Sequence, residues 1–441
     1  MAKKKQIELT IEEKLQNALV PKEEQPYKIP NNWCWTYVSN VMNIVMGQSP
    51  KGVDTTQNVS DIPLVGGASD MGDLYPRVNK YTKKATKLSK EDDVILSIRA
   101  TLGRPIFSDG VYCLGRGVAG ISSNYLSKEF IRYYYICFES SLYSNATGTT
   151  FLQVTGSVLN KMLIPLPPLN EQQRIVNIIE SLFTKLDRAK ELIENTLAQF
   201  EQNKMAILHK AFTGELTAKW RKENNIDLSS WEKIKLGKVL LPMQTKKPTG
   251  QFFRYIDIDA IDNKRQIVKA PKLILTEKAP SRASRGVETG NILFSMVRPY
   301  LKNIAQIDSD LSDCIASTGF YVCRCKPELN SRFLYYLFIF DKTIDYLMQF
   351  MKGDNSPSIR KDDLLNMKID LPTIEEQQEI VNILDKLLAK YNKIKNLEQQ
   401  LEKIELLKKA ILAKAFRGEL GTNNPDEESA ENLLKEILAE K

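Results

Sequence analysis

The chain has 441 residues but only one histidine, His209. This scarcity excludes most catalytic mechanisms in which an imidazole acts as the base. His209 lies late in a long helical pattern, where we expect a solvent-exposed residue that is favoured by the helix dipole.

Cysteines are also few, and none of them forms a C-x-x-C pair. A zinc site is therefore not expected. Cys323 and Cys325 are two residues apart, which on a strand places both side chains on one face. We expect buried free thiols in a reducing cytoplasm. The six cysteines are Cys34, Cys113, Cys137, Cys314, Cys323 and Cys325.

Long hydrophobic runs are missing. The longest apolar stretches, such as 333–340, are far shorter than the ~20 residues that a membrane-spanning helix needs. The basic residues at 3–5 are followed by polar and acidic residues, not by the apolar region of a signal peptide. These absences predict a cytoplasmic protein that does not contact a membrane.

The motifs of nucleotide and metal chemistry are absent from the sequence as well. There is no G-x-x-x-x-G-K-[ST], no G-x-G-x-x-G after a predicted strand, no H-E-x-x-H and no N-P-P-[YFW]. Paired acids such as Asp92 and Asp93, or Asp257 and Asp259, lack the partners that would mark a nuclease site. We therefore expect a chain with no catalytic residues and no bound cofactor or metal of its own.

The sequence does contain an internal repeat, in which residues 164–216 return as residues 369–420. The Glu-Gln-Gln motif at 171–173 recurs at 376–378, an offset of 205 residues. The ending Ala-Phe-x-Gly-Glu-Leu at 211–216 recurs at 415–420, an offset of 204 residues. One residue has therefore been lost inside the second copy, and the three-residue step from Ile394 to Leu397 marks the place.

Each copy is predicted to form one helix of about 40 residues, ~60 Å long. We expect Asn170 to cap the first helix, Thr373 and Glu376 to form a capping box on the second, and Gly214 and Gly418 to end them. Apolar residues recur at steps of four and three, which predicts a coiled-coil seam on each helix and packing of the two helices on each other. The seam residues are Ile175, Ile179, Leu182, Leu186, Ala189, Ile193, Thr196, Phe200 and Ile207, then Ile380, Leu384, Leu387, Tyr391, Ile394, Leu397, Leu401, Ile404 and Ile411.

The Glu-Gln-Gln motifs fall in the first helical turns. We interpret them as capping residues and as surface at the helix start, not as catalytic groups. The residues concerned are Glu171, Gln172, Gln173, Glu376, Gln377 and Gln378.

The segments before the two helices resemble each other weakly. Residues 93–97 match residues 291–295, and each run is soon followed by an arginine, Arg99 or Arg298. Short runs of Val, Ile and Tyr between frequent turns predict mixed α/β domains with a twisted sheet. The predicted order is an arm (1–28), a domain (29–168), a helix (169–222), a domain (223–371), a helix (372–421) and an acidic helical tail (422–441). Thr10 and Glu13 form a further capping box in the arm, which we expect to pack against the tail.

Positive charge is concentrated in the two domains. The chain has a net charge of +8, to which domain 29–168 contributes +3 and domain 223–371 contributes +5, whereas the tail carries −4. A polyanion would therefore bind the domains and not the tail.

Clusters of basic residues within the domains are the candidates for nucleic-acid contact. In the first domain, lysines alternate with Thr82, Thr86 and Ser89, so ammonium and hydroxyl groups could both contact phosphates. A solvated loop is the alternative interpretation of this run. Arg99 and Arg104 lie on either side of a turn at Gly103. The full set of candidates is Lys80, Lys83, Lys84, Lys87, Arg99, Arg104, Lys246, Lys247, Arg282, Arg285, Arg298 and Lys302.

Two variable α/β domains, each followed by a helix that starts L-P-x-x-x-E-Q-Q and ends A-F-x-G-E-L, make the chain similar to a known family. It resembles the specificity subunits of type I restriction–modification systems, and the resemblance covers nearly the whole chain. It implies that the domains are target-recognition domains, each reading one half of a split site in double-stranded DNA. It also implies an antiparallel pair of helices, forming a pseudo-twofold internal repeat, that separates the domains and docks two methyltransferase (modification) subunits.

The resemblance further implies that S-adenosylmethionine is bound by those methyltransferase subunits, and that motor-nuclease (restriction) subunits complete the complex. The chain itself would be non-catalytic, as its missing motifs also predict. A different class of function remains open, namely a helical scaffold whose domains bind protein or carbohydrate, because the net charge is small.

Overall fold

The computed structural model describes residues 9–148, 151–392 and 395–441. The chain divides into two compact units. Unit 1 comprises the described residues up to Leu192 together with Gln400–Lys441, and unit 2 comprises the described residues of Ile193–Gln399. Each unit therefore contains one sheet-rich domain and the helical segments that pack on it.

Unit 1 contains two four-stranded sheets, with strand orders β2-β9-β6-β7 and β3-β5-β4-β8. Valine, isoleucine and leucine fill the buried strands, of which β6 is buried at every position. The strands are β1 (Cys34–Tyr37), β2 (Asn43–Met46), β3 (Thr55–Thr56), β4 (Ile62–Val65), β5 (Tyr81–Thr82), β6 (Val94–Ser97), β7 (Gly103–Phe107), β8 (Cys113–Leu114), β9 (Val118–Ser122) and β10 (Leu163–Leu166). Its helices include α1 (Ile11–Ala18), α2 (Val38–Val41), α3 (Lys128–Cys137), α4 (Glu139–Ser144) and α5 (Gly156–Lys161).

Unit 2 repeats this plan, with four-stranded sheets of order β12-β21-β18-β19 and β16-β13-β20-β17. Its strands are β11 (Glu232–Lys235), β12 (Leu240–Leu241), β13 (Phe252–Ile256), β14 (Ile261–Asp262), β15 (Ile267–Val268), β16 (Lys272–Leu275), β17 (Ala283–Gly286), β18 (Ile292–Ser295), β19 (Ile304–Gln306), β20 (Ile315–Ser317), β21 (Phe320–Cys325) and β22 (Lys368–Leu371). Its helices include α7 (Ala218–Glu223), α8 (Ser331–Ile339), α9 (Asp341–Met348) and α10 (Lys361–Leu365). The mixed sheets that the sequence predicts are therefore present in both domains.

A two-stranded antiparallel ribbon joins the start and the end of each domain. β1 pairs with β10 in unit 1, and β11 pairs with β22 in unit 2. In each case the second strand leads, through proline, directly into a long helix. The ribbon therefore fixes the position at which each domain is attached to its helix.

The long helices begin and end close to the predicted residues. α6 runs from Leu169 to Phe212, and the second copy is described as α11 (Ile374–Asn392) and α12 (Lys395–Ala415). The predicted ends are confirmed, since Gly214 and Gly418 have left-handed backbone with φ of 82° and 72°. The predicted site of the lost residue, at Ile394, lies outside the described residues.

The predicted caps are only partly correct. Thr373 accepts a hydrogen bond from the backbone N–H of Glu376 at 3.4 Å, but Asn170 lies inside the first turn of α6 and does not cap it. The carbonyl of Pro168 accepts from the N–H groups of Glu171 and Gln172 instead, so the helix begins at Leu169, two residues earlier than a cap at Asn170 implies.

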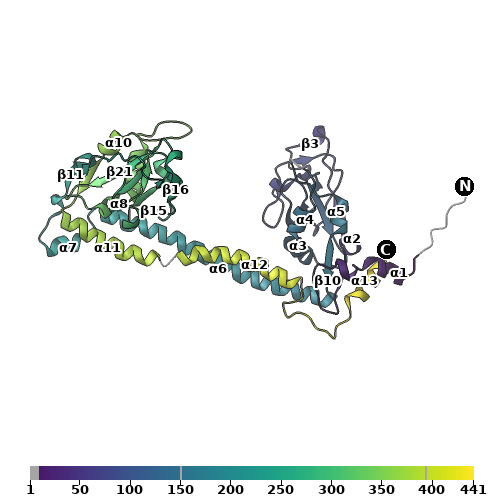
Figure 1. Cartoon of the computed structure of the whole chain (residues 1–441). Coiled ribbons are helices and arrows are strands. Elements are labelled where there is room, and N and C mark those ends of the chain that lie inside the picture. Colours follow the sequence, from purple (N-terminus) through teal and green to yellow (C-terminus); the bar gives the residue numbers. More distant parts are fainter. Residues whose placement is uncertain (1–8, 149–150, 393–394) are drawn as a thin grey trace. The chain divides into compact units, whose positions relative to one another are not determined.

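The two helical copies are antiparallel where they share a unit. In unit 1, Asp187 of α6 pairs with Lys408 of α12, and Lys190 pairs with Glu405, at 2.5 and 3.1 Å. A later residue on α6 thus meets an earlier one on α12, and Figure 1 shows α12 beside α6. Most seam residues are buried or half-buried, although Ala189 is exposed. The side chains of Tyr391 and Ile394 lie outside the described set.

The arm and the tail pack together, as the sequence predicts. Thr10 and Glu13 form the capping box of α1. The tail helix α13 (Ala430–Ala439) contributes Leu434 and Ile437 to the hydrophobic core that α1 also joins. The core therefore holds both ends of the described chain.

The cysteines are free thiols, with Cys137 and Cys325 half-buried and the other four buried, as expected. The expectation for His209 is wrong. It is half-buried, and its ring lies 6.1 Å from that of Phe340, because domain residues cover this end of α6.

Candidate nucleic-acid interface

The Glu-Gln-Gln motif of the first helix is turned inward. Glu171 is fully buried, and its carboxylate accepts hydrogen bonds from the Trp33 indole at 2.7 Å and from Thr422 and Asn423 at 2.9 Å. Trp33 comes from the domain, and Thr422 and Asn423 follow the far end of the other helical copy. One carboxylate thus connects three segments that are distant in sequence.

The second motif repeats this arrangement in unit 2. Glu376 is fully buried and accepts from the Trp231 indole at 2.9 Å and from Thr217 at 2.6 Å. Thr217 follows the end of the first helical copy, so the connection is reciprocal. The second arrangement differs from the first in containing a buried ion pair, because the buried guanidinium of Arg221 also donates to Glu376 at 2.5 Å. We call these two groups the Trp–Glu–Thr clusters.

The interpretation of the motif as exposed surface is therefore wrong for Glu171, Gln172, Glu376 and Gln377, all of which are buried. Gln172 and Gln377 donate to the carbonyls of the prolines that precede their helices, at 3.1 and 2.9 Å. Of the six motif residues, only Gln173 and Gln378 are exposed and could contact a partner directly.

The basic candidates separate into two classes according to their partners. A cation that is already paired with a protein group has less to gain from a phosphate than one that is not, because the existing pair must first be broken. The twelve candidates therefore differ according to the side-chain hydrogen bonds and ion pairs that they make within the described part of the chain.

The four candidate lysines of the first domain are unpaired within the described residues. Lys80, Lys83, Lys84 and Lys87 are exposed, and within the described residues their ammonium groups have no partner. They lie just before and after β5, and backbone hydrogen bonds join this segment to the sheet, as when the carbonyl of Lys80 accepts from Leu64 at 2.9 Å. Their position suits contact with a polyanion.

The hydroxyl groups between these lysines are not available for phosphates, contrary to expectation. Thr82 donates to the carbonyl of Asp54 at 3.1 Å, Thr86 donates to that of Gln48 at 2.5 Å, and Ser89 is buried against Ser108. Hydroxyl residues and lysines alternate because the hydroxyl groups form hydrogen bonds within the domain, whereas the lysine side chains are exposed to solvent.

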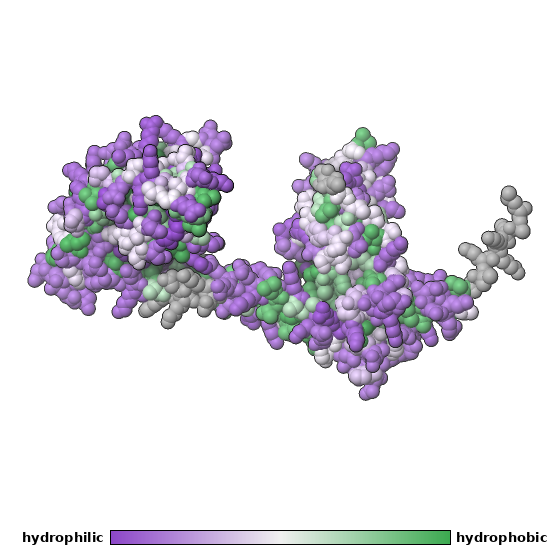
Figure 2. Space-filling model, in the orientation of Figure 1, coloured by the Kyte–Doolittle hydropathy of each residue, from purple (hydrophilic) through white to green (hydrophobic). Residues whose placement is uncertain are grey.

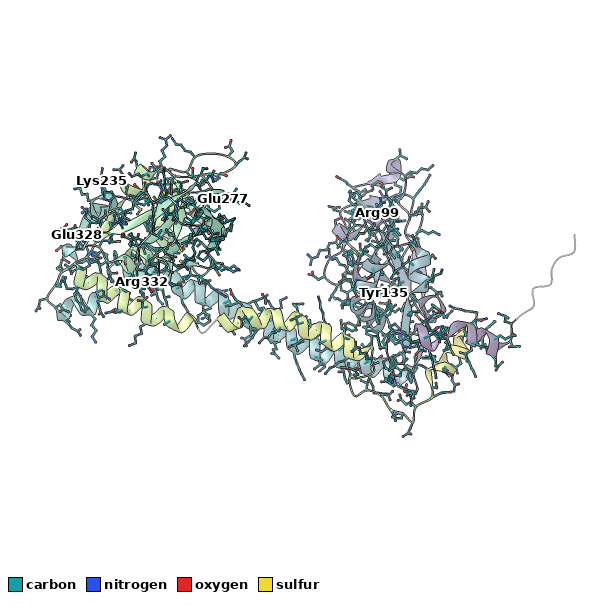
Figure 3. The ribbon with its side chains drawn as sticks, in the orientation of Figure 1. Arg99, Tyr135, Lys235, Glu277, Glu328 and Arg332 are labelled. Carbon is teal, nitrogen blue, oxygen red and sulfur yellow. The ribbon has the colours of Figure 1, made fainter. Side chains whose placement is uncertain are left out.

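Arg99 and Arg104 differ in their surroundings. Arg99 is half-buried, pairs through its backbone with Gln153, and has no side-chain partner among the described residues. Arg104 donates to the carbonyls of Ala68 and Met71 at 3.3 and 3.2 Å. Figure 3 labels Arg99 in the part of unit 1 farther from the helices than Tyr135.

Arg99 and Arg298 are not structurally equivalent, although an arginine soon follows the matched run in each domain. Ala100 and Arg298 have left-handed backbone with φ of 64° and 47°, and Arg104 and Lys302 have it with φ of 52° and 50°. Since non-glycine residues rarely adopt this conformation, the pairs mark structurally equivalent positions. Arg298 therefore corresponds to Ala100.

Arg298 and Lys302 are both engaged within unit 2. Arg298 donates to the carbonyl of Asn355 at 2.9 Å. The half-buried Lys302 donates to the carbonyl of Ile339 at 3.1 Å and forms an ion pair with Asp341. These contacts hold loops together, so both residues are weaker candidates than the sequence indicates.

The other four candidates of unit 2 lie together and are unpaired. The segment 244–246 runs antiparallel to β17, with the N–H of Lys246 donating to Ser284 at 3.0 Å and that of Gly286 donating to Gln244 at 3.1 Å. This pairing brings Lys246 and Lys247 to the strand of Arg285 and to Arg282 just before it. Within the described residues none of these four side chains has a hydrogen-bonding or ionic partner.

Sequence reasoning missed Arg116 in the first domain. It is exposed between β8 and β9, and its guanidinium has no partner within the described residues. It follows β8, where the N–H of Leu114 donates to the carbonyl of Lys87 at 2.8 Å. The available signal was its position between two glycines, Gly115 and Gly117.

Unit 2 also has a groove of about 660 Å³ between its domain and its helices. Four of its five basic residues are ion-paired: Arg332 with Asp385 at 3.1 Å, Lys302 with Asp341, Lys204 with Glu201 at 3.7 Å and Arg265 with Asp262 at 3.7 Å. In unit 1 the rings of Tyr133 and Phe183 are in contact at the equivalent place, with centroids 5.7 Å apart. Because much of its charge is already neutralised, the groove is a poor site for a polyanion.

No group of His, Cys, Asp and Glu able to hold a metal ion occurs among the described residues. Within the same part of the chain, no helix is long and apolar enough to cross a bilayer. On the face shown in Figure 2, hydrophilic residues predominate on both units and the hydrophobic patches are small.

The chain matches the family model described as the type I restriction modification DNA specificity domain, over residues 30–199 and 231–406. The specificity subunit of the type I restriction enzyme MjaX of Methanocaldococcus jannaschii is 29% identical over 202 residues, which cover 45% of this chain and 47% of that protein. The StySPI specificity subunit of Salmonella potsdam is 26% identical and the EcoKI specificity subunit of Escherichia coli K12 is 24% identical. Each of these two alignments covers 94% of this chain and 96% of the relative.

Solved structures share the fold. A chain from a structural study of complex assembly and conformational transition of the type I restriction–modification system has a TM-score of 0.69 and 22% identity, covering 90% of this chain and 100% of that chain. The crystal structure of the HsdS subunit from Thermoanaerobacter tengcongensis has a TM-score of 0.53, with the same identity and coverage.

Proposed function

The chain belongs to the family of type I restriction–modification DNA specificity domains, and on this premise we propose that it is the specificity subunit that selects the DNA site of such a complex. Each domain would contact one half of a bipartite site in double-stranded DNA. The observation that carries this proposal is the presence of unpaired basic side chains on both domains, at Lys80–Lys87 and around β17. Unpaired cations can neutralise phosphates without first breaking an internal ion pair.

The partners of the chain would be two methyltransferase (modification) subunits and motor-nuclease (restriction) subunits. The support for two copies is the helical repeat, since Gln173 and Gln378 occupy equivalent exposed positions beside their respective Trp–Glu–Thr clusters. S-adenosylmethionine and the methylation of adenine would belong to the modification subunits, and this chain would supply no catalytic residue. The complex would act in the cytoplasm, where its DNA substrate lies.

Binding by the chain alone should be weak. Domain charges of +3 and +5 allow few phosphate contacts, whereas ~6–10 contacts underlie a change in affinity of ~10³–10⁵ between 50 and 200 mM salt. Fluorescence anisotropy with duplex DNA should therefore give tight, salt-dependent binding only after modification subunits are added. Nanomolar and salt-insensitive binding by the isolated chain would contradict this view.

Exchange of residues 29–168 for the equivalent domain of another specificity subunit tests the assignment of half-sites. Methylome sequencing of cells that express the complex should show one altered half-site and one unchanged half-site. The two domains lie in separate compact units, so their DNA contacts should be independent. Alteration of both halves would contradict the assignment.

A further inference from the structure

β17 carries an arginine, Arg285, whose surroundings differ from those of the ion-paired basic residues on the strands and helices of the same domain. Arg254, Lys272, Arg324 and Arg332 all form ion pairs with an aspartate or a glutamate. Arg285 forms none within the described residues, and its Nε is buried without a hydrogen-bond partner. A buried donor without an acceptor is destabilising, so this group calls for a functional explanation.

The strand geometry holds Arg285 in place. It lies opposite Ala316 of β20 on one side and opposite Thr245 on the other. The register with β20 shifts between Ala283 and Arg285, a bulge that redirects the side chains next to it. Because Ala316 and Thr245 are small, the cross-strand neighbours do not cover the guanidinium.

The positive charge of Arg285 also acts on a buried side chain of the domain, that of Tyr321. Tyr321 of β21 is buried, and its pKa is raised to about 12 by desolvation, while the nearby positive charge of Arg285 opposes that rise. The inner end of Arg285 is therefore enclosed by the domain, since its Nε is buried. Its two terminal nitrogens have no partner among the described residues and are not among the buried unsatisfied atoms, so they face solvent.

The flanking cations occupy different positions from Arg285. Lys246, Lys247 and Arg282 are exposed and unpaired, whereas Arg285 is half-buried between them. Exposed, flexible cations are suited to bind the phosphates along the edges of a DNA groove. A half-buried guanidinium is suited to bind two acceptor atoms that lie in one plane, because its donors form a rigid fork. In the major groove of DNA, the N7 and O6 atoms of guanine are that pair.

We infer that Arg285 contacts a guanine base directly, and so determines one base pair of the half-site bound by unit 2, while Lys246, Lys247 and Arg282 bind the adjacent phosphates. This inference rests on the proposed function and places the base contact on β17. Arg298 is a weaker candidate for a base contact, because one of its terminal nitrogens donates to the carbonyl of Asn355.

The test compares Arg285→Lys and Arg285→Gln with Arg282→Gln, each in the full chain co-expressed with modification subunits. Arg285→Lys keeps the charge but loses the bidentate fork. Both Arg285 variants should lose discrimination at one G·C pair of the unit 2 half-site, by roughly 5- to 100-fold in relative methylation. Arg282→Gln should lower methylation at all sites alike and leave the motif unchanged. The half-sites are assigned beforehand by the exchange of residues 29–168.

A second measurement does not depend on the folding of any variant. The wild-type complex is titrated with duplexes in which each guanine of the unit 2 half-site is replaced in turn by 7-deazaguanine, which lacks the N7 acceptor. Binding of the wild-type complex should weaken at one position, the G·C pair at which the Arg285 variants lose discrimination.

Three results would overturn the inference: an unchanged motif in both Arg285 variants, a unit 2 half-site without a G·C pair, or indifference of the wild type to every 7-deazaguanine. A wild-type complex that methylates no bipartite motif would instead refute the proposed function, and the role of Arg285 with it.

Discussion

The indole N–H of Trp33 donates to the buried carboxylate of Glu171 at 2.7 Å, and Trp231 makes the same contact with Glu376 at 2.9 Å. In both units the carboxylate also accepts from a threonine that follows the end of the opposite helical copy, Thr422 or Thr217. Each Trp–Glu–Thr cluster therefore joins a domain, the start of one helix and the end of the other. The Glu-Gln-Gln motif recurs because this junction recurs.

The two clusters should differ in their contribution to stability. Glu376→Gln leaves the guanidinium of Arg221 buried without a counter-charge, and breaking a buried ion pair costs about 3–5 kcal/mol. Glu171→Gln weakens hydrogen bonds from neutral donors only, at about 1 kcal/mol. Urea unfolding of the two variants should show the larger loss for Glu376→Gln.

Hydrogen–deuterium exchange assigns each loss to a unit. Glu376→Gln should increase exchange in unit 2 and Glu171→Gln in unit 1, because each cluster is confined to one unit. Equal losses of stability would mean that Arg221 adds nothing to the second cluster.

The sequence predicts the repeat and the helix ends, but it does not predict this junction. A glutamate in a first helical turn is usually a surface residue favoured by the helix dipole. The burial of Glu171 depends on residues 138 and 251 positions away, Trp33 and Thr422. The available signal in the sequence was that a tryptophan recurs at the start of each domain and a threonine recurs after each helix.

The basic residues illustrate a similar limit. Sequence gives the position of a cation, but not whether a carboxylate or carbonyl lies beside it. Lys302 and Lys246 look alike in the sequence, yet the first is paired with Asp341 and the second is unpaired within the described residues. Arg298 corresponds to Ala100 and not to Arg99, as the offset of 198 residues between the runs 93–97 and 291–295 indicates and the left-handed backbone of Ala100 and Arg298 confirms.

The lysines of the first domain should act through charge alone. Lys83→Ala and Lys84→Ala should each weaken binding to all DNA sequences and lower the salt slope of log K by about one. Lys272→Ala is the matched control, because Lys272 is paired with Asp257 and should leave the slope unchanged. The measurement is anisotropy of the assembled complex at several salt concentrations. An unchanged slope in the Lys83 and Lys84 variants would favour the solvated-loop interpretation.

Lys302→Met should affect stability and not DNA binding. Loss of the half-buried pair with Asp341 should cost about 1 kcal/mol, since such pairs are partly screened by solvent. Lys246→Met should do the opposite, lowering DNA affinity with little change in the melting temperature. Thermal unfolding and anisotropy per folded molecule distinguish the two. A loss of affinity in Lys302→Met with an unchanged melting temperature would restore Lys302 as a DNA contact.

The length of α6 should set the spacing between the half-sites. Because the helical copies are antiparallel, four residues inserted after Ala198 in α6 need four more after Glu398 in α12 to keep the seams aligned. The insertion adds ~6 Å and rotates the distal part of the helix by about 40° beyond a full turn. One base pair advances DNA by ~3.4 Å and rotates it by about 34–36°.

Rotation therefore favours one additional base pair, although translation alone would allow nearly two. We expect one, because a rotational error turns a domain away from its groove, whereas ~2–3 Å can be absorbed by loops. A paired two-residue insertion rotates one domain by about 200° and should abolish specific methylation. Methylome sequencing of cells that carry each variant measures the spacing. Methylation at the original spacing by the four-residue variant would falsify the role of this helix as the ruler.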